Sequence, residues 1–349
     1  MALGHCRRRS PGSGKDRARE EEKERESQEP LVTHHIASRT LQSLAVLLVM
    51  SFVVYGLIGL MPGDPIDLMI ASDPHLTGAD AVRLKALYGL DKPWTERYLR
   101  WLMQVLQGEL GYSRLYARPV LDAMLPALAN TALLMLGALT LALVVAIPLG
   151  IAAALRPGSA FDHGVNLVAF ASVSLPTFWL GLMLIVVFAV HLGWLPASGM
   201  EEVTGGGGLA DRLRHMILPV LTLGLAGMGQ YIRHMRAAML GEAHHDYVRT
   251  ARAKGCGPAR VVLVHQLRNA LIPVTTILAL EVGGLFSGAL ITETVFAWPG
   301  MGRLIYEAVM GNDFNLALVG LLLATAMTLL GSILADLAYA ALDRRVSYK

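Results

Sequence analysis

Two short stretches of the chain contain residue types that could bind phosphate or metal. Pro11–Asp16 reads PGSGKD, which has the glycine and lysine of a phosphate-binding loop. That motif also needs a glycine five residues before Gly14, where the chain has Arg9, and a Ser or Thr after Lys15. Neither is present, so we predict no nucleotide site here.

The histidine pairs His34–His35 and His244–His245 are the other candidates. Neighbouring side chains on a helix point about 100° apart, so neither pair forms a ready metal site. Cys6 and Cys256 lie far apart and match no metal-ligand pattern or disulfide framework. The chain also lacks a G-x-S-x-G motif and a Ser–His pairing with clear spacing. We therefore predict no catalytic residues, no metal site and no enzyme activity for this chain itself.

A third stretch, Asp246–Gly257 (DYVRTARAKGCG), is basic and interrupted by glycine, and we call it the corner segment. Its first part has a helical pattern, and Gly255 suits the helix C-terminus, where a left-handed residue is often needed. Pro258 suits the first turn of a second helix, which we expect to continue through Ala259–Leu271. Helix, tight corner and helix together would project a compact knob from the rest of the molecule.

Two interpretations of the corner segment remain open from its residues alone. Its arginines could grip anionic lipid headgroups. That interpretation does not explain small residues and glycines at a defined corner. Small side chains such as Thr250, Ala251 and Ala253 would instead let the knob enter a groove on a partner protein.

The elements that position this segment are apolar helices. Of the 349 residues, 54% are hydrophobic and only 16% are charged, against about 25% in soluble domains. A membrane-spanning helix needs about 20 largely uncharged residues. The runs that meet or approach this requirement are Thr40–Leu60, Leu128–Leu155, Val165–Val190, Met216–Ile232, Ala270–Thr292 and Phe314–Leu342. The sequence thus predicts an all-α membrane protein with six transmembrane helices.

The basic residues predict the orientation. With the N-terminus in the cytoplasm, 20 of the 30 Lys and Arg residues fall in cytoplasmic segments, in agreement with the positive-inside rule. We therefore expect a multi-pass protein of the cytoplasmic membrane, embedded in the lipid bilayer, with both termini in the cytoplasm. The corner segment is then cytoplasmic.

The domain boundaries follow from these runs. We expect residues 1–38 to be a disordered charged cytoplasmic tail, because they bury too little apolar surface to fold. Residues 39–60 would be the first span, and residues 61–127 an extracytoplasmic segment with one or two amphipathic helices. Residues 124–342 would form the main membrane domain, with a cytoplasmic loop at 233–269.

The corner segment followed by HQLRNALIPV resembles the cytoplasmic signature of ABC importer permeases of the dipeptide/oligopeptide/nickel family. Other stretches are similar to that family in order and at suitable spacing. They are LMPGDP, YGLDKPW, GELGYS, SLPTFWLGLMLI, LGWLPASG, HMILPVLTLG, ITETVFAWPGMGRL and YAALDRRVSYK. The resemblance covers almost everything after the tail and is closest to dipeptide-type permeases.

The resemblance implies a type I ABC importer permease fold with an additional N-terminal helix. It implies one half of a translocation pore for di- or oligopeptides, with nickel, glutathione or another small solute as alternatives. The implied partners are a second homologous permease subunit, two ABC ATPase subunits that bind the ATP, and an extracytoplasmic substrate-binding protein. No cofactor on this chain and no nucleic acid is expected. The ATPase-coupling residues would be Asp246, Tyr247, Arg249, Thr250, Ala251, Ala253, Lys254 and Gly255.

The chain departs from the family pattern at several places. Arg249 and Thr250 replace the Glu-Ala of the wider importer signature, and Asp343–Arg345 reads DRR where the family commonly has Asp-Pro-Arg. An intramembrane enzyme would need a nucleophile–base pair or metal ligands at membrane depth, and none is evident. An ion-coupled secondary transporter would show internal hydropathy repeats and would not need the corner segment.

Glu281 lies near the middle of the predicted fifth span, where we expect a glutamine from the resemblance. A carboxylate at this depth costs about 2.5–3.5 kcal/mol on insertion scales, so it normally faces the bundle interior or a wet cavity. Three readings remain open. Glu281 could be protonated or hydrogen-bonded like the glutamine, line the pore and meet the amino group of a peptide, or pair with a cation on the second permease.

Overall fold

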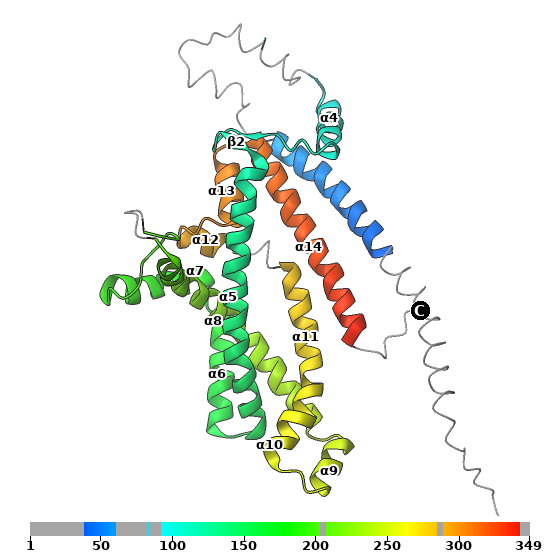
Figure 1. The fold of residues 1–349 in the computed structure, drawn as a ribbon, viewed down its shortest axis with the longest axis vertical. Helices are drawn as coiled ribbons and strands as arrows, with labels where there is room; N and C mark the ends of the chain where they lie inside the picture. The colour runs from blue at the N-terminus through cyan, green and yellow to red at the C-terminus, as the bar shows by residue number, and fades with distance from the viewer. Residues whose placement is uncertain (1–37, 61–82, 84–91, 203–206, 285–288, 343–349) are drawn as a thin grey trace, which may run out of the picture.

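The computed structural model describes residues 38–60, 83, 92–202, 207–284 and 289–342. The predicted tail, residues 1–38, lies outside this part except for its last residue. The fold is a tilted bundle of long helices (Figure 1). Helix α4, the strand β2 and helix α13 lie at one end of it, which we call the hairpin end, and α9 and α10 lie at the opposite end, which we call the corner end.

The N-terminal helix Ser38–Gly59 matches the predicted first span. Near the hairpin end it contacts the amphipathic helix α4 (Trp94–Leu106), which lies within the predicted extracytoplasmic segment. The Tyr98 hydroxyl of α4 lies 2.8 Å from Ser51 Oγ, and its ring packs edge-on against Phe52 and Tyr55. The rest of the predicted amphipathic stretch, before residue 92, is outside the described residues.

A two-stranded hairpin, β1 (Tyr112–Ser113) with β2 (Arg118–Pro119), precedes the second span and was not predicted. The long helix α5 (Val120–Leu155) follows β2 at once and begins eight residues before the predicted start. It continues through two internal prolines. Membrane helices tolerate such breaks where neighbouring groups satisfy the freed backbone.

The predicted span Val165–Val190 is broken into two helices. The region forms α6 (Ala160–Ser174), then α7 (Thr177–Leu184) with the π-helix η1 (Ile185–His191), and the two halves are bent by 103°. Proline disfavours a helical conformation in the residue before it, and Leu175 before Pro176 is extended at φ −81° and ψ 126°. Pro176 therefore marks the break.

The fourth span is longer than predicted. Helix α8 (Leu209–Glu242) includes the predicted Met216–Ile232 and continues into the predicted cytoplasmic loop. Residues 233–242 of that loop are therefore the end of α8. The helix packs along α5 and crosses α6 (Figure 1).

The fifth span also differs from the prediction. Helix α10 (Pro258–Arg260), the π-helix η2 (Val261–Gln266) and α11 (Leu267–Gly284) follow one another directly. Within the described residues, α11 extends to Gly284 and the predicted span Ala270–Thr292 is interrupted at Ala289, which is not helical. Residues 285–288 lie outside the described part. A separate short helix, α12 (Leu290–Val295), follows α11, and α13 (Met301–Met310), which was not predicted, then returns to the hairpin end.

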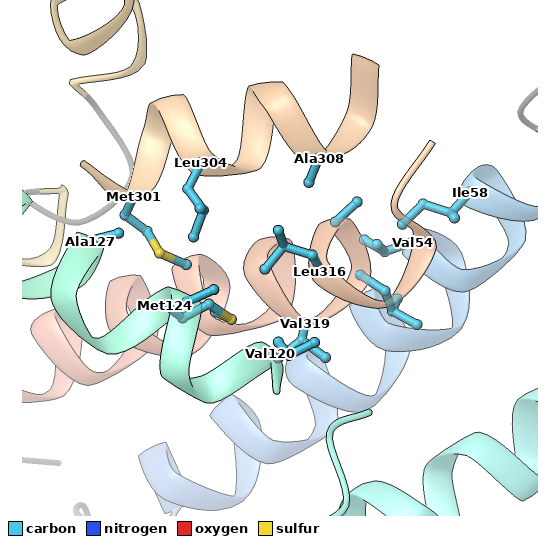
Figure 2. Packing of buried hydrophobic residues seen from close by; sticks show 13 residues of the cluster. Val54, Ile58, Val120, Met124, Ala127, Met301, Leu304, Ala308, Leu316 and Val319 are labelled. Atoms are coloured by element: carbon cyan, nitrogen blue, oxygen red, sulfur yellow. The ribbon is translucent and has the colours of Figure 1, made fainter. Parts of the chain in front are cut away.

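The last helix, α14 (Phe314–Leu342), matches the predicted sixth span. At the hairpin end it shares a core with the N-terminal helix, α5 and α13 (Figure 2). Val54 and Ile58 come from the first helix and meet Leu316 and Val319 of α14 in this core. Arg39 and Asp336 form a second link between these two helices, an ion pair of 3.1 Å.

Within the described residues, five helices are long and apolar enough to cross a membrane, and the count rises to six when the bent pair α6 and α7–η1 is one span. The fold is thus the all-α membrane protein expected from the sequence.

Candidate functional site

The corner segment is built as the sequence predicts, from helix α9 (Asp246–Ala253) and a glycine turn. Gly255 has φ +76°, a left-handed conformation that L side chains rarely adopt. The N–H of Gly255 donates to the Arg252 carbonyl at 3.0 Å, and the N–H of Cys256 donates to the Ala251 carbonyl at 3.2 Å. These two bonds form a Schellman motif, which satisfies the last carbonyls of α9. The predicted role of Gly255 in the backbone is confirmed.

The chain then turns back toward the bundle at Pro258. Gly257 is extended, and Pro258 occupies the first position of α10, where a missing N–H costs no hydrogen bond. From Pro258 the chain is helical through α10, η2 and α11 to Gly284. The corner is therefore connected directly to a membrane-spanning helix on this side.

The corner segment has a small core of its own. Val248, Ala251 and Val261 are buried together, and Tyr247 and Cys256 pack partly buried against them. This core joins α9 to η2. Ala251 is only 6% exposed, so its small side chain packs into this core and not on the outer face. On a short helix such as α9, a small side chain fits the face toward the core as well as the outer face, so its size alone does not indicate which face it occupies.

The outer face of the corner segment is polar and net basic. Its exposed residues are Asp246, Arg249, Thr250, Arg252, Ala253, Lys254, Gly255 and Gly257. Arg249 lies 3.4 Å from Asp246, but both side chains are largely exposed, so this pair adds little stability. The face therefore presents three cationic side chains with small residues between them.

A hydrogen bond connects the corner segment to α8. The Tyr247 hydroxyl donates to the carboxylate of Glu242, the last residue of α8. Partial burial and this carboxylate together raise the pKa of Tyr247 above its ordinary value. The phenol therefore stays protonated and able to donate throughout the physiological pH range. Together with the small core, this bond fixes α9 to both α8 and η2.

Two other residues considered in the sequence are Glu281 and His245. Glu281 lies in α11, but its side chain is outside the described part of the structure, so its predicted role in the pore stays a prediction. His245 stacks on the Tyr247 ring at 5.9 Å. Among the described residues, no group of three or more His, Cys, Asp or Glu side chains could hold a metal ion.

Comparison with known proteins shows the family of this chain. The model of the family described as "Binding-protein-dependent transport system inner membrane component" matches residues 146–348, which include the corner segment and every helix after α5. The chain belongs to this family. The N-terminal model of the same transport systems matches residues 32–119, which include the first span and α4.

Curated relatives cover almost the whole permease. It is 38% identical over 315 residues to the oligopeptide transport system permease protein AppB of Bacillus subtilis, a match over 90% of this chain and 99% of the relative. It is 39% identical to the di/tripeptide transport system permease protein DppB of Pseudomonas aeruginosa, over 86% of this chain and 94% of the relative. It is 36% identical to the dipeptide transport system permease protein DppB of Escherichia coli, over the same shares.

Two buried polar clusters of the permease were missed from the sequence. Glu293 in α12 is fully buried and accepts from Thr131 and from the Arg303 N–H. Asp162 in α6 is 2% exposed and pairs with Arg236 of α8. The only sign of these clusters in the sequence was that Glu293 and Asp162 each stand beside an apolar run. That signal does not identify partners 74 to 162 residues away.

Proposed function

We propose that this permease forms one half of the translocation pathway of an ABC importer for di- or oligopeptides, and that its corner segment docks on an ATPase subunit. Support comes from the corner itself, a compact basic knob with its own core and direct connections to two spanning helices. The names of its relatives support peptides as the substrate class. Nickel, glutathione or another small solute is the alternative.

In this proposal the chain performs no chemistry of its own and needs no cofactor. The ATPase subunits bind and hydrolyse ATP, a second homologous permease completes the pathway, and an extracytoplasmic binding protein delivers the substrate. Both termini and the corner segment lie on the cytoplasmic side of the inner membrane. Closure of the ATPases moves the corner segment, and α9 shares that movement with α8 and η2 because it is fixed to both.

Substitution of the exposed Ala253 tests the docking face. Ala253→Trp adds a large side chain to the outer face without entering the small core, because Ala253 is exposed. We expect the variant to insert normally but to lose co-purification of the ATPase subunits and peptide uptake. Thr95→Trp on exposed α4 is the matched control and should leave both unchanged. Normal ATPase co-purification and uptake with Ala253→Trp would show that the corner does not dock there.

Uptake of labelled dipeptides tests the transport class and the substrate. Transport should require co-expressed ATPase subunits. An ion-coupled transporter would instead work without them.

Substitution of Glu281 tests whether this side chain interacts with the amino group of a peptide in the pathway. If it lines the pathway, Glu281→Gln should keep assembly and ATP hydrolysis but selectively slow substrates with a free amino terminus. The control substrate is the same peptide with an acetylated amino terminus. Equal uptake of both substrates by both forms would leave Glu281 with the role of a hydrogen-bonded glutamine.

A further inference from the structure

An ion pair joins α6 to α8 near the corner end of the bundle. Asp162 lies in the first turn of α6, and Arg236 lies about two turns before the end of α8. Arg236 Nε lies 2.5 Å from Asp162 Oδ1, and its Nη2 lies 2.7 Å from Oδ2. Two parallel bonds of this kind fix the relative orientation of the two side chains as well as their distance.

The Asp162 carboxylate is also held from its own side. Its Oδ2 accepts from the Gly158 N–H at 2.9 Å, and its Oδ1 accepts from Asn166 Nδ2 at 2.9 Å. Ser159 caps the same helix start by accepting from the Asp162 N–H. Arg236 is therefore bound to a carboxylate that is itself fixed to α6 and to the turn before it.

Close backbone packing supplies a second, independent link between α6 and α8. A Cβ atom added to Gly229 of α8 would overlap with Ser172 Oγ and with the Ala169 carbonyl of α6. This contact is about 10–15 Å from the ion pair along α6, at 1.5 Å per residue. Two links at this separation prevent α6 from sliding along α8 or rotating against it.

The two helices lead to different functional parts. Helix α8 ends at Glu242, which is bonded to the corner segment through Tyr247. Helix α6 ends at the bend at Leu175–Pro176, beyond which α7 runs away from the bundle axis (Figure 1). A movement of the corner segment along α8 can reach the bend through the contacts between α6 and α8, and α8 also contacts α7 directly beyond the bend.

A partly buried ion pair is a poor means of stabilisation alone, because desolvation of its charges offsets part of their attraction. Its value here lies in fixing an angle between two helices. We propose that Asp162 and Arg236 are positioning residues that transmit movement of the ATPase-docked corner to the bend between α6 and α7. This inference rests on the proposed docking role of the corner segment.

The test measures the number of peptides transported per ATP hydrolysed by the complete reconstituted importer. Asp162→Asn keeps the size of the side chain and an acceptor for Gly158 but removes the charge. We expect ATPase co-purification to be unchanged, ATP hydrolysis to stay within about twofold, and uptake to fall about tenfold, a factor within the ordinary range of coupling between sites. Arg236→Lys, which keeps the charge and loses the paired bonds, should uncouple in the same direction.

Glu201→Gln is the matched control, because it breaks a 3.2 Å ion pair with Arg212 at the other end of α8. It should leave the transported-to-hydrolysed ratio unchanged. If uptake and hydrolysis fall together in Asp162→Asn and Arg236→Lys, or if neither falls, the transmission role is wrong. Loss of the proposed docking role is distinguishable, since it would appear as normal ATPase co-purification in Ala253→Trp.

Spin labels give a readout that does not depend on transport. With Cys6 and Cys256 replaced by Ser, labels at Leu167 of α6 and Lys254 of the corner report the distance between these two parts. Both side chains are exposed. We expect the same distance in the nucleotide-free and vanadate-trapped importer, and a changed or broadened distance on trapping when Asp162→Asn is added. A distance that changes on trapping without Asp162→Asn would overturn the inference.

Discussion

Glu293 shows how a single buried carboxylate organises one region of this permease. Its Oε1 accepts from Thr131 Oγ1 at 2.6 Å, and its Oε2 accepts from the Arg303 N–H at 3.0 Å. Thr131 in turn accepts from the Met301 N–H at 2.7 Å. A Cβ added to Gly300 would overlap the carboxylate. One hydroxyl thus connects α5 to both α12 and the start of α13.

Thr131→Val should destabilise the folded permease. Valine has the same shape but leaves the Met301 N–H and one Glu293 oxygen without this partner, and each such buried group costs about 1–3 kcal/mol. The measurement is the thermal unfolding midpoint of the purified importer in detergent. Thr140→Val is the control on the same helix, because Thr140 is exposed and donates to the Leu136 carbonyl of its own helix. Equal midpoints for the two variants would contradict the role given to Thr131.

At the scale of elements, three close crossings hold α8 against its neighbours. Cβ atoms added to Gly150 and Gly224 would lie 2.8 Å from Met235 and Leu141, across the α5–α8 contact. Gly229 makes the corresponding contact with α6. Small residues at such crossings let membrane helices approach closely enough for dispersion contacts between their backbones.

Gly229→Ala should separate α6 from α8, because the added methyl group meets the backbone of Ala169 and cannot be accommodated by a rotamer change. Overpacking of this kind costs about 1–3 kcal/mol. Gly227→Ala is the matched control two residues away, with open space at its Cβ. It should be neutral or stabilise the helix by up to about 1 kcal/mol. Urea or thermal unfolding of both variants measures the difference, and equal loss in both would refute the close crossing.

The elements that depend on local sequence were the ones predicted correctly. Long uncharged runs predicted the helices that could cross the membrane, five of them or six when the bent pair is one span, and the glycine and proline of the corner predicted its turn. Both signals come from residues that are close in the sequence. The hairpin was missed because long-range bonds hold it, including a 2.6 Å bond from Ser113 to Asp313. The inward position of Ala251 depends on its packing against Val261 of another helix. The local sequence pattern around Ala251 does not indicate this contact.

At the scale of the whole molecule, the orientation predicted from 20 of 30 basic residues can be measured by labelling. In a background with Cys6 and Cys256 replaced by Ser, a cysteine at Leu106 should react with an impermeant maleimide outside the cell. Leu106 is 79% exposed. Cysteines at Lys254 and Ser10 should react only after permeabilisation. Reaction of Ser10→Cys in intact cells would reverse the predicted orientation of the tail.

The core in Figure 2 can form only late in the synthesis of the chain. Val54 and Ile58 reach their partners Leu316 and Val319 only when the last span has left the ribosome. At about 5–20 residues per second, the roughly 260 residues between them take about 13–50 s to translate. During that interval, the face of the first span that will contact α14 is exposed to lipid. A chain truncated before α14 should therefore be recognised as unfinished by membrane proteases, although its earlier spans are already in place.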